Sequence, residues 1–390
     1  MKILHVIPSI APVYGGPSQA IIEMIEALHS NGVDAEIATT NNGGKELLDV
    51  TTGKCIDYKS VPVWFFPCFF PKSQAMRQFV FSTKFKSWLE QNITNYDLIH
   101  IHALFNHAST TAMKVAKSKK IPYVVRPLGQ LCQWSLNKGN IKKKIYLEMF
   151  DRANLNRSKA LHFTSKQERE EVSRLNLKMN SFILPHGLTI PNCIPEAHSK
   201  LRAKLQLSAD EQIILFLSRI HPKKGLDYLI PALSKIKDKP FTFILAGNAD
   251  FNYETEIDHL LRKHDISSRT IRTGFVEGEY KNLLLQGSDI FALTSYSENF
   301  GVAVLEALAA GTAVLTTPGV ALTSLLEREN IGYVTELNIN EIVSNLEHIL
   351  SHPKEAKEKG DRASIFVKEN YTWNLISLKM IDLYKKVISN

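Results

Sequence analysis

A regular alternation of short apolar runs with longer amphipathic stretches constrains this chain more than any other pattern. Lys2–Ile7 and Val33–Thr39 have the apolar composition of buried strands, and Pro17–Ser30 between them carries apolar residues at helical spacing. Later strands of the first half are predicted at Asp97–His102, Pro122–Arg126 and Ala160–Thr164. Strands that alternate with helices build a parallel sheet covered by helices on both faces, so the pattern predicts an α/β fold.

The alternation pauses at Leu184–Pro195, where three prolines and a glycine indicate a linker. Beyond it, strands are predicted at Gln212–Leu217, Phe241–Ala246, Thr270–Phe275, Asp289–Leu293 and Ala313–Thr316. Helices are predicted at Gly225–Lys237, Phe300–Ala310 and Trp373–Ile388.

The length of 390 residues and the central linker predict two doubly wound, Rossmann-like domains, at 1–188 and 189–370. The last helix, at 371–390, is expected to pack back on the first domain. Sheets of this kind bind ligands at the carboxyl ends of their strands, so we expect the two domains to face each other across a cleft.

The formal net charge of +8 is unevenly distributed. Residues 1–190 carry 24 Lys and Arg against 14 Asp and Glu, whereas residues 191–390 carry 23 against 25. A basic first half indicates an anionic partner, such as a lipid headgroup, a phosphorylated acceptor or nucleic acid. A merely solvated basic surface is the alternative.

The cysteines and the apolar runs favour a cytoplasmic protein. Cys55, Cys68, Cys132 and Cys193 match neither a zinc-binding spacing nor a disulfide framework, which favours a reducing compartment. No apolar run approaches the roughly 18–20 residues that a transmembrane helix needs. Met1–Ile10 lacks the apolar core and cleavage site of a signal peptide.

Aromatic residues concentrate in segment 64–88. Trp64–Pro71 is aromatic but interrupted by prolines, and Gln74–Glu90 is predicted to be a helix that carries both aromatic and basic residues. Such a combination can anchor at a membrane interface, here as a peripheral contact on the anionic inner face of the plasma membrane. The alternative is that the loop and helix pack on the protein's own core.

The stretch from Glu298 through Gly301 to Glu306 has the clearest chemical meaning. A strand is predicted before it and a helix from Phe300, whose amino end and positive dipole suit a phosphate. Glu298 could accept hydrogen bonds from sugar hydroxyls, and Glu306, about 8 Å further along the helix, could bridge the hydroxyls of a ribose. An unpaired carboxylate is costly to bury among apolar residues, which favours a bound ligand as the partner of Glu306 over a nearby cation.

Two cations follow the strand predicted at Gln212–Leu217. Arg219 and Lys224 lie in a strand-to-helix loop, where they could neutralise a diphosphate and stabilise the charge that develops on a departing nucleoside diphosphate. The pair alone is weak evidence, because basic loop residues are common on solvated surfaces.

Together these motifs resemble the retaining GT-B glycosyltransferases of family GT4. Ser297–Gly301 with Glu306–Gly311 matches the family's E-x7-E block, and Arg219 with Lys224-Gly225 matches its diphosphate-binding Arg and Lys. Tyr14–Gly16 looks like the family's N-terminal glycine loop, and Asp97–His102 resembles its D-x-x-H-x-H segment. The resemblance covers nearly the whole chain.

The resemblance implies a role for each matching position. Glu306 would bind the ribose and Glu298 the donor sugar, and the backbone amides of Asn299, Phe300 and Gly301 would hold the sugar and diphosphate. Gly15 and Gly16 would let the first-domain loop close over the phosphates. His102 would point into the cleft beside the anomeric carbon, whereas His100 is expected to be structural.

Two segments depart from the family pattern. The hinge reads Pro185-His186-Gly187 where members often carry Pro-Asn-Gly. Arg126–Leu131 resembles a subgroup's Ser-Pro-His/Arg-Gly-Met-Leu segment but lacks the basic residue before the glycine. Both departures concern the acceptor side and leave the predicted donor site intact.

The resemblance further implies transfer of a hexose with retention of configuration from a nucleoside-diphosphate sugar, with UDP or GDP as the leading carriers. The acceptor would be a saccharide or a lipid-linked oligosaccharide in surface-glycan synthesis. No cofactor is expected, and no metal, since the Asp-x-Asp motif of metal-dependent transferases is absent from the sequence.

Three alternatives stay open from sequence. A GT-B-type nucleotide-sugar epimerase would share the fold and the donor but would need no acceptor. A non-catalytic nucleotide-sugar-binding protein would bind the nucleotide without turnover, which the complete set of Arg219, Lys224, Glu298 and Glu306 argues against. A nucleic-acid-binding role is suggested only by the basic first half and lacks a recognisable module, so no nucleic-acid partner is expected.

Overall fold

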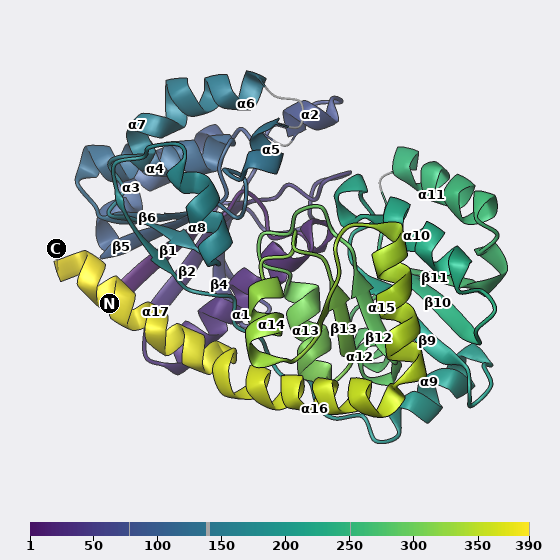
Figure 1. Cartoon of the computed structure of the whole chain (residues 1–390). Coiled ribbons are helices and arrows are strands. Elements are labelled where there is room, and N and C mark those ends of the chain that lie inside the picture. Colours follow the sequence, from purple (N-terminus) through teal and green to yellow (C-terminus); the bar gives the residue numbers. More distant parts are fainter. Residues whose placement is uncertain (78, 138–140, 250, 390) are drawn as a thin grey trace. The chain divides into compact units, whose positions relative to one another are not determined.

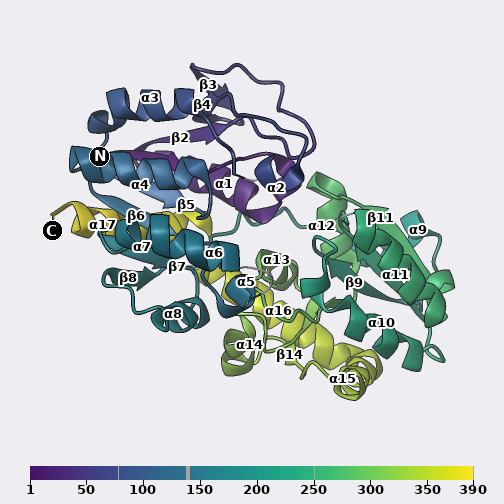
Figure 2. The ribbon, with the colours of Figure 1, turned by 90° about the horizontal axis from the view of Figure 1, so that it is seen from above.

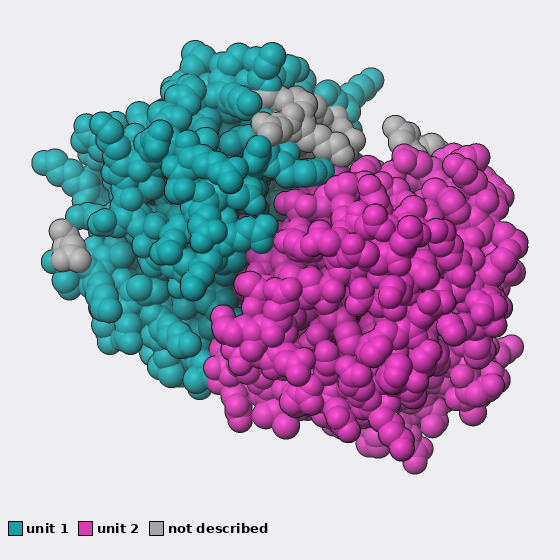
Figure 3. All heavy atoms as spheres, viewed as in Figure 1, with its two compact units in different colours: residues 1–189, 371–390 teal, residues 190–370 magenta. Residues whose placement is uncertain are grey.

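The computed structural model describes residues 1–77, 79–137, 141–249 and 251–389. The chain divides into two compact units, coloured separately in Figure 3: unit 1 is Met1–Thr189 with Tyr371–Asn390, and unit 2 is Ile190–Asn370. Each unit is an α/β fold built on a largely parallel sheet (Figure 1), which confirms the predicted fold class.

Unit 1 contains an eight-stranded sheet whose order is β3-β4-β2-β1-β5-β6-β7-β8. All neighbouring strands are parallel except β3 and β4. The strands are β1 Lys2–Val6, β2 Asp34–Thr40, β3 Cys55–Tyr58, β4 Val61–Phe66, β5 Leu98–His102, β6 Tyr123–Arg126, β7 Ala160–Phe163 and β8 Asn180–Ile183. The chain order reverses between β1 and β5, and such a switch point places a ligand-binding crevice at the carboxyl ends of those two strands.

Helices cover both faces of this sheet (Figures 1 and 2). Ile3 and Leu98 belong to the core beneath α1 and α17, whereas their neighbours Leu4 and Ile99 belong to the core beneath α3, α4, α7 and α8. This alternation follows from the two-residue period of a strand. The helices are α1 Gly16–Ser30, α2 Gln74–Arg77, α3 Thr83–Asn92, α4 His107–Lys119, α5 Gln133–Asn137, α6 Ile141–Tyr146, the π-helix η3 Leu147–Asp151, α7 Arg152–Leu155, α8 Lys166–Ser173 and α17 Trp373–Ser389.

The aromatic segment differs from the prediction. Its first part belongs to the buried strand β4, and the predicted helix Gln74–Glu90 is wrong, because α2 and α3 are separate helices with residue 78 between them outside the described residues. Ser82 starts α3 afresh, since its hydroxyl accepts a hydrogen bond from the amide of Phe85 at 3.2 Å. Phe85 and Leu89 are fully buried in the core of unit 1, so α3 turns its apolar face inward.

Unit 2 contains a six-stranded, fully parallel sheet in the order β11-β10-β9-β12-β13-β14. Its strands are β9 Gln212–Leu217, β10 Phe241–Ala246, β11 Thr270–Gly274, β12 Ile290–Leu293, β13 Ala313–Thr316 and β14 Tyr333–Val334. Its helices are α9 Ala197–Leu205, α10 Leu226–Lys235, α11 Phe251–Lys263, α12 Gly278–Gly287, α13 Val302–Ala310, α14 Thr323–Glu329, α15 Ile339–Ser351 and α16 Pro353–Asn370. The order reverses between β9 and β12, which is the switch point of this unit. Within the described residues, no helix combines the length and apolar character that crossing a bilayer requires.

The C-terminal helix α17 is fixed to unit 1 at its first turn. The amide of Leu188 donates to the carbonyl of Tyr371 at 2.7 Å, and the indole nitrogen of Trp373 donates to Glu23 of α1 at 2.6 Å. A Cβ atom at Gly187 would lie only 2.4 Å from the Trp373 ring. The absence of a side chain at Gly187 therefore allows the Trp373 indole to occupy this position.

We predict that Gly187→Ala destabilises the protein by about 1–3 kcal/mol, the usual cost of overpacking a core. The new methyl group must displace Trp373 from Glu23. Urea unfolding followed by circular dichroism measures the loss. Trp373→Ala provides the matched background, because it removes the ring atoms and leaves only the contact with the Cα atom of residue 373, so Gly187→Ala should cost less there. An equal cost in both backgrounds would show that the Trp373 contact is not responsible.

Candidate functional site

The switch point of unit 2 brings together the predicted donor-site residues. Arg219 and Lys224 lie in the loop after β9, Glu298 lies in the loop after β12, and Glu306 lies on α13, which follows that loop. Residues far apart in sequence therefore share one edge of the sheet, because the carboxyl ends of parallel neighbours lie side by side.

The two loops are joined through their backbones. The amide of Tyr296 donates to the carbonyl of Lys223, and the hydroxyl of Thr294 donates to the carbonyl of Gly225, both at 2.9 Å. Gly225 has φ of 70°, and a Cβ atom there would lie 1.8 Å from the carbonyl oxygen of Thr294. Only glycine permits this approach, which fixes the position of the preceding Lys224.

Lys224 and Glu298 form an ion pair across the two loops, with only 12% and 20% of their side chains exposed. Burial alone would raise the pKa of Glu298, but Lys224, with weaker contributions from Lys223 and Arg219, holds the pKa below its usual value. Glu298 is therefore an ionised carboxylate surrounded by cations. From the sequence, Lys224 and Glu298 were each predicted to contact a ligand. The structure shows that the two side chains also contact each other.

Helix α13 begins beside this ion pair. The predicted helix start at Phe300 is two residues early, because Gly301 is the N-cap, with φ of 92°, and α13 runs from Val302. Phe300 is buried and Asn299 is half-buried. The positive end of the α13 dipole therefore lies at the loop that carries Glu298.

Glu306 has an internal partner that the sequence did not reveal. The ammonium of Lys281, on α12, donates to its carboxylate at 2.8 Å, with 27% and 18% of the two side chains exposed. The expectation that Glu306 lacks a nearby cation is therefore wrong. No sequence signal identifies Lys281, since only the packing of α12 against α13 brings the two side chains together.

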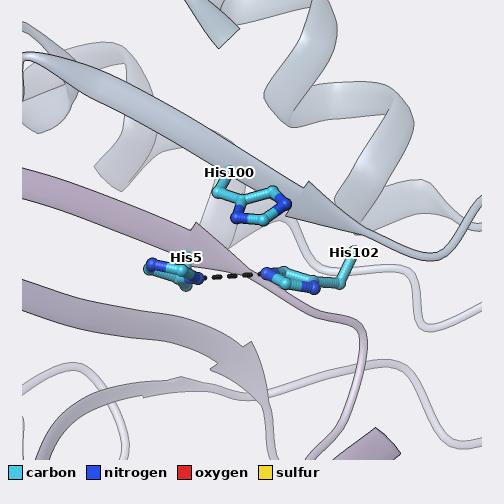
Figure 4. Close-up of side chains that lie close together, drawn as sticks. All are labelled: His5, His100 and His102. Carbon is cyan, nitrogen blue, oxygen red and sulfur yellow. Dashed lines mark hydrogen bonds between the residues drawn. The ribbon is translucent and has the colours of Figure 1, made fainter. Parts of the chain in front are cut away.

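The switch point of unit 1 carries the predicted glycine loop and histidines. Gly15 is the N-cap of α1 after the 3-10 turn Pro12–Tyr14, Gly16 is the first residue of α1, and both are exposed. His102 ends β5 and is only 2% exposed. Its ring nitrogen Nε2 lies 3.0 Å from Nδ1 of His5 in β1 (Figure 4).

His5, His100, His102, Arg126 and His162 all lie on the sheet face beneath α17. His5 is paired in register with His100, and His102 with Arg126. Each histidine and Arg126 is almost fully buried. Burial lowers the pKa of all four histidines, to about 3 for His5, and the positive charge of Arg126 lowers them further.

Hydrogen bonds fix the tautomers of two of these neutral rings. Nε2 of His162 lies 2.8 Å from the carbonyl of Leu184, so it must carry the proton, and Nδ1 of His162 then accepts from Nε2 of His100 at 3.3 Å. Nδ1 of His100 is left as an acceptor, and the hydroxyl of Tyr384, on α17, donates to it at 2.6 Å. The sequence expectation that His100 is structural agrees with this arrangement.

The rings of His5, His100 and His102 also have metal-ligand spacing, with one nitrogen of each lying within 4.8 Å of the others. These residues fit a metal poorly. Both nitrogens of His100 are already hydrogen-bonded, and the buried Arg126 guanidinium opposes a second positive charge. The cluster fits a hydrogen-bonded core network better than a metal centre.

The two departures from the family pattern contact each other. Nη2 of Arg126 donates to Nε2 of His186 at 2.9 Å. Arg126 has no acceptor atom, so Nε2 of His186 must be the acceptor in this bond. The hinge histidine is thereby connected to the same buried network as His102.

A strained loop follows His102. Ala103 and Phe105 have φ of 67° and 57°, a region that residues with a side chain rarely adopt. Asp151, at the end of η3, accepts from the amide of Phe105 at 3.4 Å and from the hydroxyl of Thr110 at 2.8 Å. Burial raises the pKa of Asp151 to about 6. The loop is therefore held in place by a carboxyl group that was not predicted as a site residue.

Two family models match the chain: "Glycosyl transferase 4-like domain" over residues 15–184 and "Glycosyl transferases group 1" over residues 198–365. N,N'-diacetylbacillosaminyl-diphospho-undecaprenol alpha-1,3-N-acetylgalactosaminyltransferase of Campylobacter jejuni is 25% identical over 78% of this chain and 81% of its own length. An uncharacterized glycosyltransferase of Methanocaldococcus jannaschii is 28% identical over 49% of each chain. The chain thus spans about half the length of the latter relative.

Solved structures show the same fold. Sucrose-phosphate synthase from Thermosynechococcus elongatus superposes with a TM-score of 0.81 at 20% identity, covering 100% of both chains. Anabaena HepE in complex with UDP superposes with a TM-score of 0.77 at 21% identity, covering 99% of this chain and 100% of its own. At these identities the likeness concerns the fold, and it confirms the predicted GT-B architecture.

The buried histidines predict a loss of stability in acid. Their pKa values are lowered in the folded protein, so the unfolded chain binds more protons below its own pKa near 6.5, and stability falls as the pH falls through that value. Each such histidine should cost about 1.4 kcal/mol between pH 7.5 and pH 5.5. Urea unfolding at the two pH values measures the change.

His162→Phe should reduce the loss of stability between pH 7.5 and pH 5.5 by about 1.4 kcal/mol, the contribution of one histidine. The variant should also be less stable than wild type at pH 7.5, because the Leu184 carbonyl loses its hydrogen-bond donor. His352→Gln is the matched control, because His352 is exposed. If the two variants have the same pH dependence, His162 is not held neutral by burial.

Proposed function

Because the chain belongs to the group 1 glycosyltransferases, a GT4-like family with the GT-B fold, we propose that it transfers a hexose-type sugar from a nucleoside-diphosphate sugar to a saccharide or lipid-linked acceptor. The observation that carries the proposal is the set of Arg219, Lys224 and Glu298 at the switch point of unit 2. The reaction serves the synthesis of a surface polysaccharide or another glycan. The name of the Campylobacter relative contains a diphospho-undecaprenol-linked sugar, which supports a lipid-linked acceptor.

The proposed donor is a UDP- or GDP-sugar. Arg219 and Lys224 would contact the diphosphate, supported by the amides of Asn299, Phe300 and Gly301 near the positive end of α13. Glu298 would hold the sugar hydroxyls and Glu306 the ribose. HepE, which has the same fold, was solved in complex with UDP, and this supports UDP as the carrier of the donor sugar.

The proposed transfer retains the anomeric configuration by a front-face route. The bond between C1 of the sugar and the diphosphate oxygen breaks, and the acceptor oxygen bonds to C1 from the same side. The acceptor proton passes to the leaving phosphate oxygen. Arg219 and Lys224 stabilise the negative charge that grows on the diphosphate, which is the largest contribution a preorganised site makes.

Unit 1 is proposed to supply Gly15, Gly16 and His102 to the same reaction. His102 is a neutral ring at the carboxyl end of β5, because burial lowers its pKa. A neutral imidazole can orient a sugar hydroxyl without adding charge near the oxocarbenium-like centre. We propose that the reaction needs no metal, since the sequence lacks an Asp-x-Asp motif; loss of activity in excess chelator would contradict this.

We also propose that the protein acts in the cytoplasm, in peripheral contact with the inner face of the plasma membrane. A lipid-linked acceptor would be met there. The basic composition of residues 1–190 supports attraction to anionic lipid.

We predict that Arg219→Ala and Lys224→Ala each lower turnover by on the order of 10²–10³, the usual effect of removing one preorganised donor. Lys223→Ala, a cation in the same loop, is the matched control and should lose far less. Lys224→Met separates loss of charge from loss of side-chain volume. Near-normal turnover in both alanine variants would overturn the assignment of the donor site. Donor consumption without acceptor would indicate epimerase chemistry instead.

We predict that Glu306→Gln weakens nucleotide binding by about tenfold, because a carboxylate that accepts ribose hydroxyls makes stronger hydrogen bonds than an amide. Thermal shifts against a panel of UDP-, GDP- and ADP-sugars identify the donor and then measure this loss. Lys281→Met tests whether the neighbouring cation affects nucleotide binding. It removes the ion-pair partner of Glu306 and leaves Arg219 and Lys224, the proposed diphosphate contacts, unchanged. Equal thermal shifts in wild type and Glu306→Gln would exclude Glu306 from the nucleotide site.

A further inference from the structure

An exposed apolar ridge runs along α6 and η3. Ile141, Ile145 and Met149 are spaced four residues apart, so they share one helix face, and they are 78%, 50% and 69% exposed. Leu147 and Asp151 on the opposite face are buried in unit 1. The segment therefore already packs on the protein through one face, and its apolar ridge lies outside the two hydrophobic cores of unit 1.

Aromatic side chains extend this ridge. Phe150, beside Met149, is 41% exposed and packs against Tyr146, with ring centres 5.0 Å apart and ring planes tilted by 44°. Phe79 lies 6.1 Å from Tyr146 and is 37% exposed. We use "α6 ridge" for the set Ile141, Ile145, Met149, Phe150 and Phe79. A contiguous exposed apolar surface of this kind indicates a binding partner.

Lysines border the α6 ridge. Helices α3, α4 and α6 together carry eight lysines and a single carboxylate, Glu90, while the exposed Glu148 of η3 is paired with Arg152 at 2.6 Å. α4 packs between α3 and α7 on the same side of the sheet (Figure 2). The ammonium of Lys114, on α4, lies 5.4 Å from the ring centre of Phe150, so positive charge and apolar surface are in direct contact.

We propose that the α6 ridge inserts into the interface of an anionic lipid bilayer, with the lysines of α3, α4 and α6 contacting its headgroups. Apolar residues flanked by lysines on a surface helix are the features that hold a helix in the plane of a membrane. A protein partner with an acidic face would also match the charge. Large aliphatic side chains exposed this far suit the fluid acyl boundary better than a shaped protein surface.

This inference deepens the proposed peripheral membrane role and moves the contact. The sequence placed it at segment 64–88, where Phe65, Phe66 and Phe85 are buried but Phe69, Met76, Phe79 and Phe81 are exposed. We centre the contact on residues 141–150, which the sequence had not singled out. Phe79 is the residue of the earlier segment that the α6 ridge retains.

Vesicle flotation of the full chain tests the proposal, with vesicles of phosphatidylcholine alone and of phosphatidylcholine with phosphatidylglycerol. Wild type should float with the anionic vesicles and show little binding to the neutral ones. The variant I141Q/I145Q/M149Q should lose at least about tenfold in vesicle affinity, since three apolar side chains no longer insert. K142Q/K144Q should also bind anionic vesicles more weakly and become less sensitive to salt.

The matched controls are I365Q and K263Q/K354Q, which change an exposed apolar residue and two exposed lysines of unit 2 and should bind as wild type does. Melting temperatures confirm that every variant is folded.

Wild-type vesicle binding by I141Q/I145Q/M149Q would overturn the proposal, as would equal binding of wild type to both vesicle types. If light scattering shows that the triple variant converts a dimer to a monomer while vesicle binding is unchanged, the α6 ridge is an interface between two copies. The flotation assay contains neither nucleotide-sugar nor acceptor, so it measures membrane binding separately from transferase activity. Loss of vesicle binding with intact activity would contradict only the membrane proposal, and loss of activity with intact vesicle binding would contradict only the proposed function.

Discussion

The ion pair between Lys224 and Glu298 is the interaction on which the geometry of the unit 2 switch point depends. It joins the loops after β9 and β12, and it forms because Gly225 lets the two backbones approach within a distance that any side chain would prevent. Removing two charges from water costs energy that their attraction only partly returns. The pair is therefore better explained by the positions that it gives to its two charged groups than by a gain in stability. It holds one cation and one carboxylate at the strand ends where the sheet order reverses.

The two units treat charge in opposite ways at equivalent places in their sheets. Unit 2 keeps Arg219 exposed and Glu298 ionised at its switch point. Unit 1 fills its switch point with neutral histidines, kept so by burial and by the buried Arg126. Ionic groups suit an anionic ligand, whereas neutral rings suit the orientation of uncharged hydroxyls. This division agrees with a donor role for unit 2 and an acceptor role for unit 1.

The sequence predicted the elements set by local pattern and missed those set by packing. β9, β10 and β13 begin and end at the predicted residues, because buried parallel strands are continuous apolar runs. β4 was missed because prolines flank and interrupt its aromatic run, and the helix predicted over 74–90 ignored the fresh start that Ser82 gives α3. The residues of the proposed donor site were located from their motif. Lys281 and His5 were not, because only helix packing and strand register bring them to Glu306 and His102.

The strained loop after β5 connects the histidine network to the proposed membrane surface. His102 and Phe105 stand at its two ends, and the ring of Phe105 lies 6.1 Å from that of Tyr146 in α6, next to the α6 ridge. Asp151 holds the loop from the end of the same helical segment. A π-helix such as η3 often marks a functional site, because its extra residue turns side chains that an α-helix would align differently. Met149 faces outward and Asp151 inward, as residues two positions apart on a helix do. The contact between Phe105 and Tyr146 thus places the loop after His102 next to the α6 ridge, the surface that is proposed to contact lipid.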